Sequence, residues 1–404
     1  MSLKRKIMGD MVLNIIAVMI PVASLQLVVY PITARIVGSE SYGLMLTVYS
    51  VWIMISNSLG NVLNNVRLLH NNEYENNKIV GDFSILLKRW SIINSIAICG
   101  ALMYYCGFNN IVHIVLGIIV SILVILKDYT EVGFRIHLNY KAIFINNFLQ
   151  GIGFFIGTIG LYITHNWECI FLCGYLFSCI YCIKNTQILK EPSCKTTLFN
   201  EVSRDANQLV LATVISNAMN YADKLVLYPL MGGHAVSIYY TATILGKIIG
   251  LLTGPINSVV LSYISKWKNT QVNVLNKVFF FGVLASIIGY GFTLIISRPV
   301  LSVLFPQWVD EVVKYIPITT INVLLLALVS IVSPFILKFY AMKWQIIMNT
   351  ISSVVYFSSA FFLWKRFGLI GFCYGTVIGT LTKLLIMIFV HYIYSQKRNK
   401  GEVI

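Results

Sequence analysis

Long runs of apolar residues, separated by short polar segments, dominate the chain. A helix needs roughly 17–25 mostly apolar residues to cross a hydrocarbon core of about 30 Å. The runs have this length and predict an all-α polytopic membrane protein with about twelve transmembrane helices. The expected spans are residues 11–34, 42–63, 90–107, 110–126, 143–163, 167–183, 207–230, 238–262, 278–296, 313–336, 345–364 and 368–392.

The positions of lysine and arginine predict the orientation of these spans, because cytoplasmic loops carry an excess of both residues. Of the 30 such residues, 22 fall in the two termini and the loops on their side, 5 fall on the opposite side and 3 lie inside spans. The lysine and arginine excess alternates from loop to loop. If one span were missed or wrongly added, the excess would appear on the opposite side in every later loop. Both termini are therefore expected in the cytoplasm.

Composition supports the membrane assignment. The 404 residues are 57% hydrophobic and 11% charged, and the mean hydropathy is +0.78. Soluble domains average about 25% charged residues. The net charge of +15 follows from the loop bias and fits attraction to anionic membrane lipids. Its basic residues are scattered without interleaved aromatics, so a nucleic-acid partner is not expected.

The cysteines do not form a recognisable metal or redox motif. Cys179 and Cys182 make a C-x-x-C pair, but they lie in an apolar span with no second ligand pair nearby. Small packing residues are the better interpretation. No metal and no cofactor are expected.

The two halves of the chain show a weak internal repeat. At an offset of 194 residues, the segment 36–44 aligns with 230–238, and each follows an apolar-Tyr-Pro step. Both segments join the first span of a half to its second. We therefore expect two six-helix lobes, residues 1–190 and 191–404. An even number of spans gives the halves the same orientation, and transporters with parallel halves bind substrate between them.

Ionisable residues inside spans mark candidate functional positions, because each costs at least about 2.5–3.5 kcal/mol at the centre of a helix in lipid. Lys247 is expected about 13 Å deep at 1.5 Å per residue. It shares a small, polar helix face with Thr243, Gly250, Gly254 and Asn257. Lys247 is therefore a candidate ligand-binding residue, although packing against a carboxylate would also explain it.

Four further charged residues are candidates. Asp223 is the only carboxylate predicted well inside a span, and it could pair with a cation or couple transport to protons. Lys224 follows it, but neighbouring side chains point about 100° apart, so the two are not expected to pair. Lys383 and Lys224 could instead extend toward the membrane surface. Arg35 lies at the outer end of the first span, where an interfacial anchor is equally plausible.

A polar face on the second span matches the face around Lys247. It consists of Ser50, Asn57, Asn61 and Asn64. Interhelical hydrogen bonds would also explain these residues. With three or four intramembrane cations against one carboxylate, a cavity lined by these groups favours an anion, and phosphate is the obvious target for lysine and arginine.

An enzyme is not expected. The other carboxylates are mostly assigned to loops, including Asp128 and Glu131, and no nucleophile-and-base pair or ligand cluster is apparent. No catalytic residue is therefore assigned.

Four segments resemble the Wzx-type polysaccharide flippases of the MOP (multidrug/oligosaccharidyl-lipid/polysaccharide) exporter superfamily. They are Tyr30–Gly43, Phe134–Tyr140, Asp223–Lys247 and Gly368–Gly375. The departure is at His234, Ala235 and Val236, where that family more often has glycine and an acidic residue.

The resemblance implies a MATE/MOP-like fold with a central cationic cavity and alternating access in a bacterial inner (plasma) membrane. It implies a lipid-linked oligosaccharide substrate on an undecaprenyl diphosphate carrier, with a polysaccharide polymerase and a length regulator as further partners. By position, Arg35 and Lys247 match the family's basic residues, and Lys224 and Lys383 match less closely.

We therefore expect a flippase that moves an oligosaccharide repeat unit to the outer leaflet for capsule or O-antigen assembly. The substrate-binding candidates are Lys247, Arg35, Lys224, Lys383, Asn57 and Asn61, and Asp223 is the coupling candidate. The alternatives are a MATE-type cation-coupled drug or metabolite antiporter and an accessory protein of polymer assembly. The first usually has more intramembrane carboxylates and the second usually has a large extramembrane domain.

Overall fold

The computed structural model describes residues 3–251, 272–339 and 342–399, and every regular element in these ranges is a helix. The elements are α1 (Leu3–Ala23), η1 (Ser24–Val29), α2 (Tyr30–Trp52), η2 (Ile53–Asn57), α3 (Ser58–Asn77), α4 (Asp82–Cys106), α5 (Ile111–Thr130), α6 (Val132–Ile136), α7 (Tyr140–Thr164), α8 (Glu168–Asn185), η3 (Ile188–Lys190), α9 (Phe199–Leu251), α11 (Val272–Leu304), α12 (Val309–Val312), α13 (Ile316–Phe339) and α14 (Met342–Asn399). The all-α prediction is confirmed for these residues.

Eight helical segments of the described chain are long and apolar enough to cross a membrane. Two of them, Val12–Asn77 and Ile347–Ile393, contain 66 and 47 residues, which is much longer than one crossing requires. The chain is a multi-pass membrane protein. The count of twelve spans and the cytoplasmic termini stay predictions.

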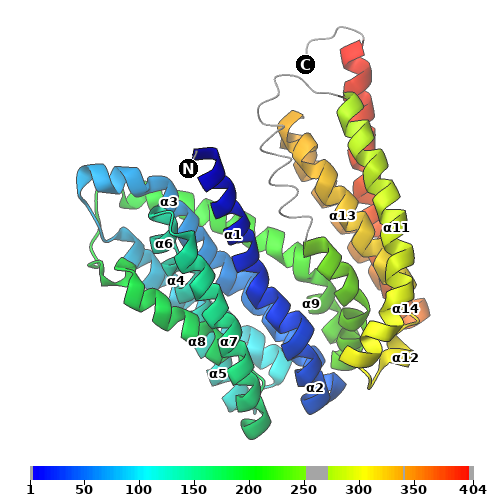
Figure 1. The fold of residues 1–404 in the computed structure, drawn as a ribbon, viewed down its shortest axis with the longest axis horizontal. Coiled ribbons are helices and arrows are strands. Elements are labelled where there is room, and N and C mark those ends of the chain that lie inside the picture. Colours follow the sequence, from blue (N-terminus) through cyan, green and yellow to red (C-terminus); the bar gives the residue numbers. More distant parts are fainter. Residues whose placement is uncertain (1–2, 252–271, 340–341, 400–404) are drawn as a thin grey trace. The chain divides into compact units, whose positions relative to one another are not determined.

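Three long helices are broken by a glycine with a positive φ. Gly38 interrupts α2 with φ 76° and ψ 174°, Gly232 interrupts α9 with φ 80° and ψ 179°, and Gly368 interrupts α14 with φ 60° and ψ −137°. These are conformations that favour glycine. Each break lies at a predicted junction between spans, and the ribbon reverses near the label α2 in Figure 1.

The backbone breaks support the internal repeat. Gly38 and Gly232 are separated by the same 194 residues that align the two junction segments. Their φ values differ by only a few degrees, as do their ψ values. Two chain reversals of one geometry at equivalent positions agree with a duplicated six-helix arrangement.

The chain divides into two compact units, Met1–Ser237 and Ile238–Ile404. We call them the N-terminal and C-terminal units. The first contains α1 to α8 and most of α9, and the second contains the end of α9 together with α11 to α14. In the C-terminal unit, α13 packs against both α11 and α14. The expected lobe boundary after residue 190 stays a prediction.

The segment after α8 is held onto the N-terminal unit by polar contacts. Asp82 accepts hydrogen bonds from the backbone of Thr196 at 2.7 Å and from the hydroxyl of Tyr74 at 2.6 Å. Arg67 is buried, its guanidinium lies 4.9 Å from the ring centroid of Tyr74, and it pairs with Glu191 at 2.8 Å. Burial raises the pKa of Glu191, and the charge of Arg67 opposes this rise.

Helices α7 and α8 approach each other through small residues. A Cβ atom on Gly153 would lie 2.6 Å from the carbonyl oxygen of Cys173, and one on Gly157 would lie 2.4 Å from that of Cys169. Small residues allow this approach in membrane helices. Cys182 is fully buried in an apolar cluster with Ala17 and Phe134. These contacts agree with the interpretation of the cysteines as packing residues.

We expect Gly157→Ala to lower the free energy of unfolding by about 1–3 kcal/mol, because the added methyl group must displace backbone of α8. The measurement is the melting temperature in detergent micelles. Gly100→Ala is the matched control, since a Cβ there meets nothing within 4 Å and alanine favours a helix. An equal effect of the two substitutions would contradict the close contact.

Candidate functional site

The two repeat junctions contact each other within the N-terminal unit. The Glu40 carboxylate accepts hydrogen bonds from the backbone N–H groups of Gly233 at 2.9 Å and His234 at 2.7 Å. These N–H groups begin the helix that follows the break at Gly232, where a carboxylate is favoured by the helix dipole. A Cβ on Gly43 would lie 1.9 Å from the carbonyl oxygen of Gly233, so the two backbones touch.

The departure from the family pattern at His234 has a local explanation. Its Nδ1 lies 2.8 Å from the hydroxyl of Ser39. His234 is the repeat equivalent of Glu40, so both of these equivalent positions contribute a side chain to the contact. Arg35 lies before this junction on α2 and is exposed.

Asp223 and Lys224 form an ion pair, so the expectation that they would not pair was wrong. The Lys224 ammonium lies 3.2 Å from Asp223 Oδ1 and 5.1 Å from the ring centroid of Tyr221. Lys224 is only 5% exposed. A long lysine side chain can bend across the angle between neighbours, and leaving either charge alone in apolar surroundings costs more. A coupling role for Asp223 stays a prediction.

Lys247 is half-buried, and its ammonium lies 4.8 Å from the ring centroid of Tyr240. Tyr240 precedes it by two helical turns and therefore shares its face. Thr243, on the same predicted face, is buried. Gly254 and Asn257, which complete that face, lie outside the described residues.

Lys383 is half-buried on α14 and makes no hydrogen bond or ion pair within the described ranges. One turn before it, Thr380 lies 2.8 Å from Asn322 of α13. A Cβ on Gly246, the residue before Lys247, would lie 2.9 Å from Val323. Helix α13 thus brings the helices that carry Lys247 and Lys383 together at the step Asn322–Val323.

Two of the four residues on the polar face of the second span make interhelical hydrogen bonds, the alternative left open above, and a third, Ser50, bonds the backbone of its own helix at Leu46. Asn57 donates to Asp128 Oδ2 at 2.7 Å, and Asn64 donates to the backbone oxygen of Asp128 at 2.7 Å. Gly60 permits this approach, since a Cβ there would lie 2.7 Å from the Cβ of Asp128. Asn61 is half-buried and has no hydrogen bond within the described part of the chain.

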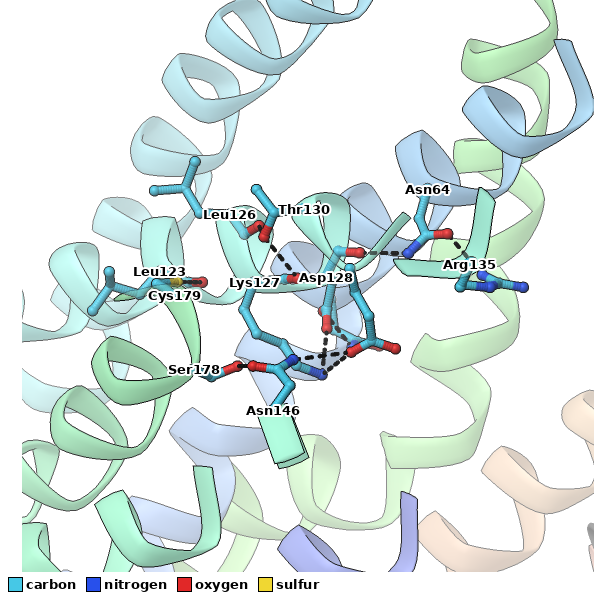
Figure 2. A network of polar contacts seen from close by, with 12 residues as sticks. Asn64, Leu123, Leu126, Lys127, Asp128, Thr130, Arg135, Asn146, Ser178 and Cys179 are labelled. Atoms are coloured by element: carbon cyan, nitrogen blue, oxygen red, sulfur yellow. Dashed lines mark hydrogen bonds and ion pairs between the residues drawn. The ribbon is translucent and has the colours of Figure 1, made fainter. Parts of the chain in front are cut away.

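Figure 2 shows the buried polar network to which these amides belong. The Lys127 ammonium lies 3.3 Å from Asp128 and 3.3 Å from Glu131. Arg135 donates to Asn64 at 2.7 Å, and Asn146 of α7 reaches Glu131 at 3.4 Å. The four ionisable side chains carry two charges of each sign, so the network as a whole is neutral.

The assignment of Asp128 to a loop was wrong, whereas Glu131 lies in the turn between α5 and α6. Helix α5 continues to Thr130, and Asp128 is 6% exposed. The predicted span ended at the charged residues because hydropathy falls there. Lys127 and Glu131 stand at the i, i+4 spacing of a helical ion pair, which is the signal that could have shown the helix continuing.

A second buried pair was also missed. His113 Nδ1 on α5 lies 2.5 Å from Glu168 Oε1 on α8, and Glu168 is fully buried. The His113 ring stacks on Trp167 at 5.9 Å. Asp223 is therefore not the only buried carboxylate. Among the described residues, no group of three or more His, Cys, Asp or Glu side chains could hold a metal ion.

Solved structures of membrane transporters resemble the chain. The lipid II flippase MurJ in its inward closed conformation matches with a TM-score of 0.69 and 15% identity, covering 95% of this chain and 86% of MurJ. An outward-facing MATE family transporter of the MOP superfamily matches with a TM-score of 0.65 and 13% identity, covering 97% and 96%.

The chain has the MOP fold. A mutant of the Vibrio cholerae MATE transporter VcmN has the same arrangement, with a TM-score of 0.55, 10% identity and coverage of 96% and 95%. No family model and no curated protein matches the chain by sequence. The MATE/MOP-like fold is therefore confirmed.

We expect Lys127→Met to lower the free energy of unfolding by about 3–5 kcal/mol, because it leaves the buried Asp128 and the half-buried Glu131 without their shared cation. Thermal unfolding in detergent micelles measures the change. Arg298→Met is the control, since the Arg298–Asp310 pair is mostly exposed and such pairs contribute about 0–1 kcal/mol. Equal losses in the two variants would contradict a buried role for Lys127.

Proposed function

We propose that the chain is a flippase that moves an undecaprenyl-diphosphate-linked oligosaccharide from the cytoplasmic to the outer leaflet of a bacterial inner membrane. The observation that supports it most is the charge balance of the C-terminal unit. Its expected spans contain Lys247 and Lys383 but no Asp or Glu, since the acidic residues after Ser237 are Asp310, Glu311 and Glu402.

In the N-terminal unit, several cationic side chains lie close to carboxylates of the same unit. Lys127 has Asp128 and Glu131, Lys224 has Asp223, and Arg67 has Glu191 within reach. The expected spans that contain Lys247 and Lys383 have no Asp or Glu, so the side-chain charges within these spans sum to a positive value. A diphosphate is attracted by positive charge, and lysine is a common phosphate ligand.

The proposed roles follow from these positions. Lys247 and Lys383 hold the diphosphate from the two sides of the Asn322–Val323 step, and Arg35 meets it at the outer mouth. Asn61 contacts sugars, whereas the amide nitrogen of Asn57 is engaged by Asp128. Lys224 lies beside Asp223 and adds positive charge only when that pair opens. The MurJ structure, that of a lipid II flippase, supports a lipid-linked substrate.

Alternating access would require the contact at Glu40 to open and close, because it joins the outer turns of the two halves. The repeat unit would be used for capsule or O-antigen, with a polysaccharide polymerase and a length regulator acting after the flippase.

A MATE-type antiporter is the second candidate, because MATE structures match over nearly the whole chain. The charge balance favours the flippase, since an exporter of organic cations would need negative charge where Lys247 and Lys383 lie. Transport of a cationic dye by proteoliposomes, unaffected by undecaprenyl diphosphate, would favour the antiporter.

In a strain whose surface polymer depends on this protein, we expect Lys247→Gln and Lys383→Gln each to reduce surface polymer by about tenfold or more, since each removes one contact of at least about 1.4 kcal/mol to a charged group. Immunoblots of surface polymer and of the protein in the membrane measure the effect. Lys365→Gln is the control, because Lys365 is exposed and its ammonium lies 4.7 Å from the ring centroid of Phe361. Normal polymer in both lysine variants would refute the proposed site.

A further inference from the structure

The side-chain amide of Asn322 is buried, and only one of its two polar atoms has a hydrogen-bond partner among the described residues. The residue is 7% exposed on α13, and its Oδ1 lies 2.8 Å from the hydroxyl of Thr380 on α14. That hydroxyl is also 3.0 Å from the carbonyl oxygen of Thr376. Among the described contacts, the Thr380 hydroxyl reaches the amide through Oδ1. The other amide atom has no hydrogen bond in the described ranges.

The second amide atom of Asn322 is accessible. Among the described residues it is not one of the buried polar side-chain atoms without a hydrogen-bond partner, although the neighbouring Val323 and Leu324 are apolar and buried. The hydrogen bond to Thr380 positions the amide, and its other atom can bond a ligand.

The surroundings of Asn322 are those of the proposed diphosphate site. Thr380 and Lys383 are three residues apart on α14 and so lie on one face. On the other side, Val323 contacts Gly246, the residue before Lys247. Asn322 therefore lies at the step of α13 that is flanked by the two lysine-bearing helices.

The hydrogen-bonding capacity of the amide indicates which part of such a substrate it binds. A phosphate oxygen only accepts hydrogen bonds, and the two lysines can donate them. A sugar hydroxyl both donates and accepts, as an amide does, and it can bond whichever amide atom Thr380 leaves over. We infer that Asn322, held in place by Thr380, binds a hydroxyl of the sugar attached directly to the diphosphate. This inference rests on the proposed function.

The test compares two ligands on the purified full-length protein. One is undecaprenyl diphosphate, and the other is the same lipid carrying a single N-acetylhexosamine. Dissociation constants are measured by microscale thermophoresis in detergent micelles. We expect Asn322→Leu to weaken binding of the sugar-bearing lipid by about tenfold, since one hydrogen bond to a buried group is lost. Binding of undecaprenyl diphosphate should change less than about twofold, within the usual effect of a neutral packing change.

Thr380→Val is the second variant and keeps the test informative if Asn322→Leu does not fold. It removes the hydroxyl that positions the amide, so the same ligand should lose about threefold to tenfold in affinity. Thr382→Val is the matched control on α14, because the Thr382 hydroxyl bonds only the carbonyl oxygen of Ile378 at 2.8 Å. Lys383→Gln should weaken binding of both ligands.

The outcomes separate the two proposals. A selective loss of the sugar-bearing lipid in Asn322→Leu and Thr380→Val supports the inference. Equal changes in the affinities for the two ligands, or no change, overturn the inference about Asn322. If Lys383→Gln then still weakens binding of both ligands, the proposed flippase function stands. A wild-type protein that binds neither lipid overturns the proposed function and this inference with it.

Discussion

The cost of a charge in apolar surroundings is the constraint on which the rest of the structure depends. Helices that cross a membrane satisfy their own backbone, so side-chain charges are what remains to be balanced. In the N-terminal unit the balance is internal. Lys127 lies between Asp128 and Glu131, and Arg67 reaches Glu191. In the C-terminal unit the expected spans contain Lys247 and Lys383 and no Asp or Glu, and the proposed anionic substrate rests on this asymmetry.

Close backbone approach is the second constraint, and glycine makes it possible. Gly157 lets α7 and α8 touch, and Gly43 meets the backbone of Gly233 where the two repeat junctions join. Glu40 then stabilises this contact by accepting from two N–H groups at the start of a helix. The same element that reverses the chain, a glycine with positive φ, thus also creates the helix N-terminus that the carboxylate binds.

The sequence predicted much of the fold from two periodic signals, the apolar runs and the alternating lysine and arginine bias. The junctions at Gly38, Gly232 and Gly368 lie where the runs are interrupted, and the glycines at repeat-equivalent positions have the same torsion angles. Where hydropathy falls inside a continuing helix, the prediction fails. Residues 127–130 are the clearest case, because their charges are neutralised by one another and by the neighbouring helices, which a count along the chain does not register.

For the candidate site too, some features could be predicted from the sequence and others came only from the tertiary structure. The sequence by itself determined that the chain crosses a membrane, and it predicted an internal repeat and the presence of Lys247 and Lys383 within spans, because hydropathy and charge are properties of single residues. Only the tertiary structure decided which polar groups already have a partner within the protein. It shows the ion pair of Lys224 with Asp223 and the hydrogen bond from Asn57 to Asp128. It also places the Asn322 amide, with one hydrogen-bonded atom, on α13 between the helices that carry Lys247 and Lys383. For Asn57 and Asn322 the partner lies on a helix far away in the chain, and these distances arise only when the helices pack. For Lys224 the partner is its neighbour in sequence, and the conformation of the lysine side chain in the packed structure decides the pairing.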